Sequence, residues 1–134
     1  MKRIATFALF TLLAVAPAAQ ARLRVFACEP EWASLVAELA GDKVDVDVAT
    51  SALQDVHQIE ARPSLIAKLR RADLSVCTGA ELESGWLPQL VRQSGNQKVA
   101  GGNGVFEAAR QVKTLQKPAV LDRALLDEVR SISD

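Results

Sequence analysis

Aromatic residues and excess basic charge are scarce in this sequence. It has no tyrosine, aromatic residues make up 4% of it, and 16 basic residues balance 16 acidic ones, so the formal net charge is zero. Single-stranded nucleic acids are bound by stacking bases on aromatic rings. Nucleic-acid grooves also need a concentrated basic face. We therefore expect no nucleic-acid partner.

Motifs of familiar enzymes are also missing. Cys28 and Cys77 lie far apart, so there is no Cys-x-x-Cys redox pair. There is no Gly-x-Ser-x-Gly elbow, and the only histidine, His57, stands in no recognisable catalytic triad. The glycines of residues 101–104 lack the spacing of a phosphate-binding loop. We expect neither an enzyme nor an organic cofactor.

Residues 1–21 are typical of a cleavable secretory signal peptide. Lys2 and Arg3 give a positive start, Ile4 to Val15 is almost wholly apolar, and Ala19-Gln20-Ala21 offers small residues to a signal peptidase. A membrane-spanning helix needs about 20 apolar residues, more than this run contains. The sequence thus predicts export to the periplasm. In that oxidising compartment the two cysteines form either a disulfide or two buried thiols.

The rest of the chain alternates strand-like and helix-like segments. Strands are expected at residues 23–28, 44–49, 74–77 and 98–100, and helices after Pro30, after Pro63 and over residues 86–91. Valine alternates with aspartate from Val44 to Val48, which favours a half-exposed strand near a sheet edge. Residues 106–115 are compatible with a helix, and residues 121–132 are amphipathic. This order predicts an α/β fold with a four-stranded, mainly parallel sheet flanked by helices and an irregular or helical C-terminal tail.

Three polar segments follow the predicted strands. In an open parallel sheet, ligands bind beyond the carboxyl ends of the strands. Cys28-Glu29, the loop containing His57, and Cys77-Thr78-Gly79 all fall at this edge. His57 is either an ordinary surface residue or a metal ligand, because imidazole is the commonest metal ligand.

Residues 55–64 resemble the segment with the first metal-ligating histidine of periplasmic zinc and manganese binding proteins. These are the solute receptors of ABC metal importers, the ZnuA/TroA-like cluster A-I. Cys-Glu-Pro-Glu-Trp after the first strand, the helix after Pro63, and residues 77–88 agree with the family in order and spacing. The resemblance covers roughly residues 23–123.

The resemblance implies a protein of two α/β lobes with a metal ion held between them. Such receptors capture Zn²⁺ or Mn²⁺ and pass it to a permease in the inner membrane. His57 matches a family ligand, with a zinc–nitrogen bond of about 2.0–2.1 Å. Its second ring nitrogen needs an acceptor, and Asp55 or Glu60 is expected to provide it, unless these carboxylates are only solvated loop charges.

The resemblance also divides the chain. Residues 1–21 are the signal peptide, residues 22–123 the N-terminal lobe, and residues 124–134 a divergent tail in place of the linking helix and second lobe. A closed zinc site has four ligands, so we expect an incomplete, truncated or frame-shifted receptor. The alternative is a non-transporting remnant or an interaction module, in which two copies pair through the exposed face of the lobe.

The resemblance bears on the cysteines as well. The first and third strands are neighbours in the family's sheet, which brings their ends toward disulfide distance. This favours a disulfide between Cys28 and Cys77. The other arrangement, a soft-metal site of both thiolates with His57, is disfavoured by oxidation after export.

Overall fold

The computed structural model describes residues 21–113. The predicted signal peptide up to residue 20, the end of the predicted lobe from residue 114, and the predicted tail at 124–134 lie outside the described residues. So does the amphipathic segment at 121–132. Within the described range, no helix combines the length and the apolar character needed to cross a membrane.

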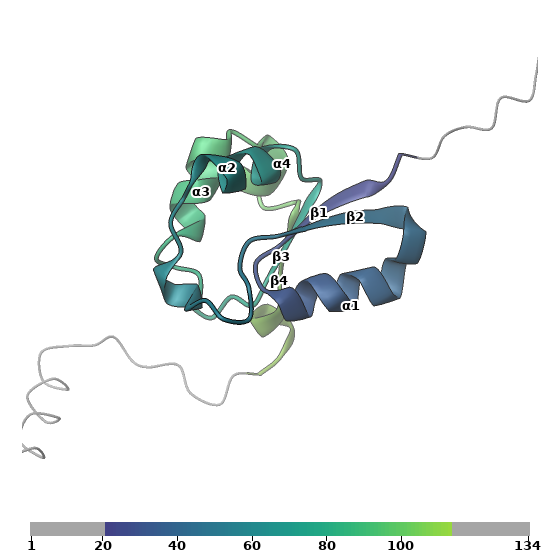
Figure 1. Ribbon diagram of the computed structural model, residues 1–134, viewed down its shortest axis with the longest axis horizontal. Helices are drawn as coiled ribbons and strands as arrows, with labels where there is room; N and C mark the ends of the chain where they lie inside the picture. The colour runs from purple at the N-terminus through teal and green to yellow at the C-terminus, as the bar shows by residue number, and fades with distance from the viewer. Residues whose placement is uncertain (1–20, 114–134) are drawn as a thin grey trace, which may run out of the picture.

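Four parallel strands form one sheet in the order β2-β1-β3-β4 (Figure 1). The strands are β1 (Leu23–Ala27), β2 (Val44–Val48), β3 (Leu74–Cys77) and β4 (Val105–Glu107). The helices are α1 (Pro30–Ala40), α2 (Pro63–Arg70), α3 (Leu87–Ser94) and α4 (Gln97–Ala100). Short 3-10 turns cover η1 (Gly41–Lys43), η2 (Val56–Gln58) and η3 (Ala108–Gln111). The predicted α/β fold is confirmed, and the valine–aspartate strand β2 lies at the sheet edge.

Local sequence signals explain where the helices begin and end. Pro30 and Pro63 occupy the first turns of α1 and α2, where a missing backbone N–H and a fixed φ cost nothing. Gly95 ends α3 with a φ of 65°, in the left-handed region, which glycine adopts without a Cβ penalty. The starts of α1 and α2 agree with the sequence prediction, whereas α3 ends at Ser94 and not at the expected residue 91.

The prediction of the fourth strand is wrong. Residues 98–100 belong to α4, because the Asn96 side chain accepts a hydrogen bond from the Lys98 N–H at 3.0 Å and starts a helix there. The strand β4 lies further on, partly where residues 106–115 had been compatible with a helix. Its three residues pair with β3, Ser75 with Val105 and onward. A strand of three residues is too short to show alternating apolar and polar residues in the sequence, so its conformation is determined by its pairing with β3.

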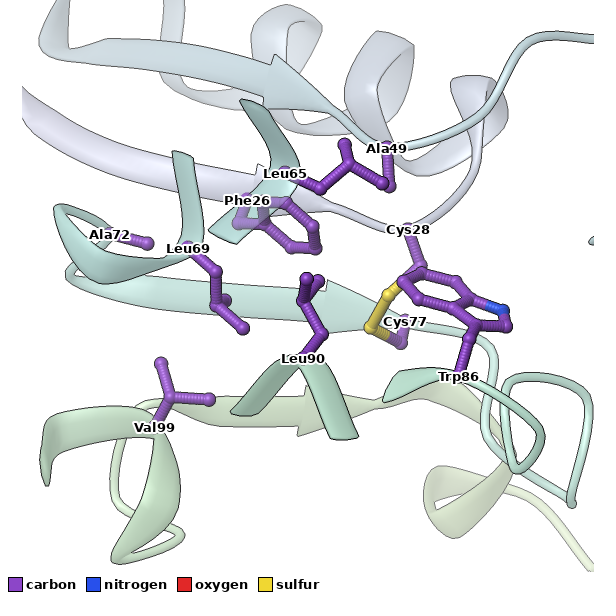
Figure 2. Close-up of a cluster of buried hydrophobic side chains, with 10 residues drawn as sticks. All are labelled: Phe26, Cys28, Ala49, Leu65, Leu69, Ala72, Cys77, Trp86, Leu90 and Val99. Carbon is purple, nitrogen blue, oxygen red and sulfur yellow. A yellow bond between two sulfur atoms is a disulfide. The ribbon is translucent and has the colours of Figure 1, made fainter. Parts of the chain in front are cut away.

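The main core lies between the sheet and helices α2, α3 and α4 (Figure 2). Its buried members come from strands, helices and the segments that join them: Phe26, Cys28, Ala49, Leu65, Leu69, Ala72, Cys77, Trp86, Leu90 and Val99. Helix α1 lies beside β1 and β2 (Figure 1) and has no fully buried residue. The best-packed part of the molecule therefore extends to the carboxyl ends of β1 and β3.

Candidate functional site

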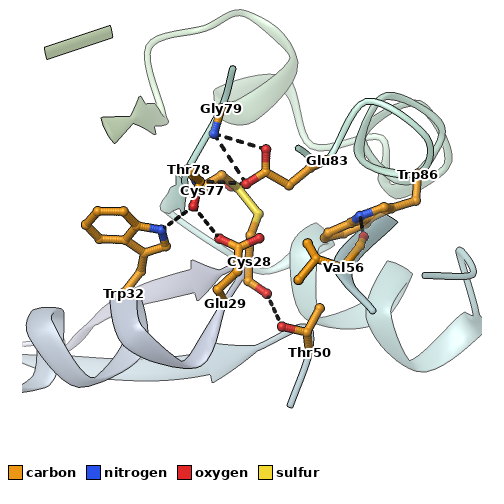
Figure 3. The surroundings of a disulfide bond; sticks show 11 residues. Cys28, Glu29, Trp32, Thr50, Val56, Cys77, Thr78, Gly79, Glu83 and Trp86 are labelled. Atoms are coloured by element: carbon orange, nitrogen blue, oxygen red, sulfur yellow. Dashed lines mark hydrogen bonds between the residues drawn. A yellow bond between two sulfur atoms is a disulfide. The ribbon is translucent and has the colours of Figure 1, made fainter. Parts of the chain in front are cut away.

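A disulfide joins the ends of the two central strands (Figure 3). Cys28 and Cys77 are fully buried, and their Cα atoms are 4.9 Å apart. The Cys28 N–H donates to the Val76 carbonyl at 2.9 Å, which continues the ladder between β1 and β3 up to the bridge. Of the two states left open by the sequence, the structure holds the disulfide.

The segment after β3 turns back on itself and is held by the carboxylate of Glu83. This carboxylate accepts the backbone N–H of Thr78 at 2.8 Å and that of Gly79 at 3.0 Å. Ala80 and Glu81, at the tip of the turn, have positive φ values of 51° and 72°. Glu83 is 3% exposed, so a buried carboxylate replaces the regular backbone partners that this turn lacks.

Glu29 is the second buried carboxylate at this edge. Its Oε2 accepts a hydrogen bond from the Thr78 hydroxyl at 3.1 Å, and that hydroxyl accepts one from Trp32 Nε1 at 2.8 Å. Its Oε1 is buried without a partner. Burial raises the pKa of Glu29 to about 7, and the charge of Glu83 adds to this effect. The folded chain therefore holds a proton on Glu29 more tightly than an exposed glutamate would.

Cys28, Cys77 and Glu83 are a cluster of metal-ligand residue types among residues 21–113, with one ligand atom from each lying within 4.8 Å of the others. The two sulfurs are bonded to each other, so they provide no thiolate ligand. His57 does not belong to this cluster. The soft-metal set of two cysteines and His57 is not assembled in this structure.

His57 lies on the exposed turn η2, beside Asp55. Its Nδ1 is 2.9 Å from Asp55 Oδ1, and its backbone N–H donates to the same oxygen at 2.9 Å. The backbone N–H of His57, followed by its imidazole, lowers the pKa of the Asp55 carboxyl. An ionised carboxylate only accepts hydrogen bonds, so in the neutral form of the imidazole Nδ1 carries the proton and Nε2 has the free lone pair. Within residues 21–113, the exposed Glu60 forms no side-chain hydrogen bond.

Gly85 and Trp86, which follow the turn held by Glu83, contact the loop that contains His57. Trp86 Nε1 donates to the Val56 carbonyl at 2.8 Å. Gly85 lies so close that a Cβ on it would be 3.2 Å from the His57 carbonyl oxygen. The sequence indicated Trp86 as the beginning of a helix and as part of the segment that resembles the family, but not as a partner of the loop of His57. Neither this contact nor the burial of Glu29 and Glu83 has a sequence signal, because both depend on how distant loops meet.

A family model covers most of the chain. The model of the zinc-uptake complex component A, a periplasmic protein (ZnuA), matches residues 25–125. The chain belongs to the ZnuA family. The resemblance predicted from the sequence is thereby confirmed.

Known proteins and solved structures are similar to parts of this chain. The manganese ABC transporter substrate-binding lipoprotein PsaA of Streptococcus anginosus is 33% identical over 76 residues, which are 54% of this chain and 25% of that protein. A zinc-bound ZnuA deletion mutant is 25% identical, with a TM-score of 0.62 over 75% of this chain and 36% of the mutant. The periplasmic zinc binding protein TroA of Treponema pallidum is 18% identical and has the same fold, with a TM-score of 0.62 over 77% of this chain and 35% of TroA.

The chain thus spans about a quarter of the length of the PsaA protein that it matches. The residues that the family model matches include His57, the disulfide and both buried carboxylates. The predicted boundaries at residues 22–123 and 124–134, and the roles of His57, Asp55 and Glu60, stay predictions.

Proposed function

We propose that this chain captures a zinc or manganese ion in the periplasm, as the receptor component of an ABC importer, with His57 as a ligand. The observation that carries this proposal is the geometry of the imidazole. Nδ1 lies 2.9 Å from the Asp55 carboxylate, and the side chain of His57 is 67% exposed. A histidine held by a carboxylate on one nitrogen and free on the other has the arrangement of a metal ligand.

The cargo and the partner follow from the relatives. PsaA is named as a manganese ABC transporter substrate-binding protein, and one structural neighbour is a zinc-bound ZnuA. Both metals accept an imidazole nitrogen, and zinc prefers it. The partner is then the inner-membrane permease, the protein is a transport receptor with no enzymatic activity, and residues 22–123 are its N-terminal lobe.

His57 alone does not complete a zinc site. It is the only histidine in the chain, and a closed zinc site has four ligands. Carboxylates, water or a second polypeptide fill the remaining positions.

Calorimetric titration with Zn²⁺ and with Mn²⁺ tests the ligand assignment. His57→Ala should abolish measurable binding, because it removes the imidazole. Asp55→Asn should weaken binding about 10- to 100-fold, the usual effect of losing a carboxylate that orients a ligating histidine. Glu60→Gln is the matched control, since its exposed carboxylate does not contact the imidazole, and it should bind like the parent chain. Equal affinities for His57→Ala and the parent chain would reject His57 as a ligand.

The second candidate is an interaction module that pairs two copies of the chain. It is favoured by large apolar side chains that are 41–77% exposed, namely Leu23, Leu35, Leu39 and Phe106. Exposed apolar patches mark interaction surfaces. Light scattering with and without zinc separates the two candidates, because an interaction module is dimeric in both conditions and the proposed receptor is not.

A further inference from the structure

Trp86 lies where the disulfide meets the loop of His57. Its side chain is 1% exposed and shares the core cluster with Cys28 and Cys77. Figure 2 shows the indole beside the disulfide. From this rigid position its Nε1 reaches the Val56 carbonyl oxygen at 2.8 Å (Figure 3).

The bond to Val56 fixes the peptide group on which His57 is mounted. The carbonyl of Val56 and the N–H of His57 belong to one planar peptide unit. Trp86 holds the oxygen of this unit, and Asp55 Oδ1 accepts its N–H at 2.9 Å. The same Asp55 oxygen lies 2.9 Å from the imidazole Nδ1. Trp86 and Asp55 therefore restrain both ends of the unit from which the imidazole extends.

Gly85 adds a second restraint. A Cβ at this position would lie 3.2 Å from the His57 carbonyl oxygen, closer than ordinary van der Waals contact. The carbonyls of Val56 and His57 therefore both rest against the Gly85-Trp86 dipeptide. Residues 51–55 of the loop are all exposed, so these contacts are major restraints on an otherwise solvated segment.

The dipeptide itself is firmly anchored. The Trp86 N–H donates to the Glu83 carbonyl at 3.2 Å, and the Leu90 N–H donates to the Trp86 carbonyl at 3.0 Å, inside the first turn of α3. The Glu83 carboxylate in turn holds the start of the turn after β3. A chain of hydrogen bonds thus connects the backbone of His57 to the disulfide-linked ends of β1 and β3.

We propose that Trp86 is a positioning residue for metal capture: its indole N–H, backed by the disulfide, pre-organises His57 for the incoming ion. This inference rests on the proposed function, in which His57 is a ligand. A ligand already held in place loses less conformational freedom on binding than a ligand on a mobile loop. Losing Trp86 should therefore weaken metal binding without removing any ligand atom.

The test compares two tryptophans in the full chain. Trp86→Phe removes the bond to Val56, and Trp32→Phe removes an indole bond of the same 2.8 Å length to the Thr78 hydroxyl. Trp86→Phe should weaken Zn²⁺ binding about tenfold, the lower end of the range for residues that orient a ligand. In the metal-free chain, it should also lower the ¹⁵N order parameter of the His57 amide from about 0.85 toward about 0.6. Trp32→Phe should change neither quantity.

Two further variants separate the positioning of His57 from a general loss of stability in the core. Leu90→Val trims the same core without touching the loop, and it should leave the His57 order parameter unchanged. Gly85→Ala pushes on the His57 carbonyl and should reproduce the effect of Trp86→Phe. An unchanged order parameter in Trp86→Phe, or an equal drop in Leu90→Val, would overturn the positioning role. If the parent chain binds no zinc while Trp86→Phe still loosens His57, the proposed function fails and the positioning of the loop stands.

Discussion

Replacing Cys28 and Cys77 together by alanine should lower the free energy of unfolding by about 4 kcal/mol. The disulfide closes a loop between residues 49 positions apart, and a cross-link of this length removes much conformational entropy from the unfolded chain. It also lies fully buried between the two central strands. Since small domains are stable by about 5–15 kcal/mol in total, this loss is a large fraction. Urea unfolding of the parent and the variant measures it.

Two controls separate the cross-link from the packing of the cysteine side chains. The parent chain unfolded in a dithiol reductant keeps both sulfur atoms and should lose a similar amount of stability. Cys28→Ala alone leaves one free thiol and no cross-link. Its free energy of unfolding should lie within about 1 kcal/mol of that of the double variant. If the oxidised and reduced parent chains unfold at the same urea concentration, the bridge does not stabilise this fold as described.

The second large effect concerns pH. Ionisation of Glu29 should lower the free energy of unfolding by up to about 3 kcal/mol as the pH rises from about 4.5 to about 7. Burial, with the charge of Glu83, raises its pKa from 4.5 to about 7 in the folded chain, so the folded state binds this proton more tightly than the unfolded state does. The stabilisation is fully present below pH 4.5 and is lost as the pH passes the folded pKa. Unfolding at a series of pH values follows it.

Glu29→Gln isolates this contribution. The amide stays neutral at every pH, so the variant should be more stable than the parent at pH 8 and should show a flatter pH profile. Glu38→Gln removes an exposed carboxylate from helix α1, which begins directly after Glu29, and should leave the slope unchanged. A parent-like slope in Glu29→Gln between pH 4.5 and 7 would contradict the assignment.

Strong local patterns carried the prediction of the fold. Pro30 and Pro63 marked the first turns of two helices, and the alternation from Val44 to Val48 identified the edge strand, because these signals reflect short-range geometry. The strand β4 was missed because its three residues are strand only through pairing with β3. Sequence reasoning fails here because tertiary pairing overrides a weak local preference.

The candidate site divides in the same way. Residue type alone singled out His57 and the two cysteines, since these side chains have distinctive chemistry. The contact of Trp86 with Val56 was not predicted, because it joins residues 30 positions apart. The burial of Glu29 and Glu83 was not predicted either, because acidic residues are almost always exposed. Their burial arises where the turn after β3 folds back over the disulfide. Only the assembled structure brings that turn against the loop of His57.

The most direct test of metal capture observes the imidazole itself. His57 is the only histidine in the chain, so its two ring nitrogens give one pair of ¹⁵N signals. On titration with Zn²⁺ we expect the Nε2 signal to shift, while Nδ1 keeps its proton and its bond to Asp55. Signals that stay unchanged at saturating zinc, or a shift at Nδ1 with loss of its proton, would contradict the proposal that His57 presents Nε2 to the metal.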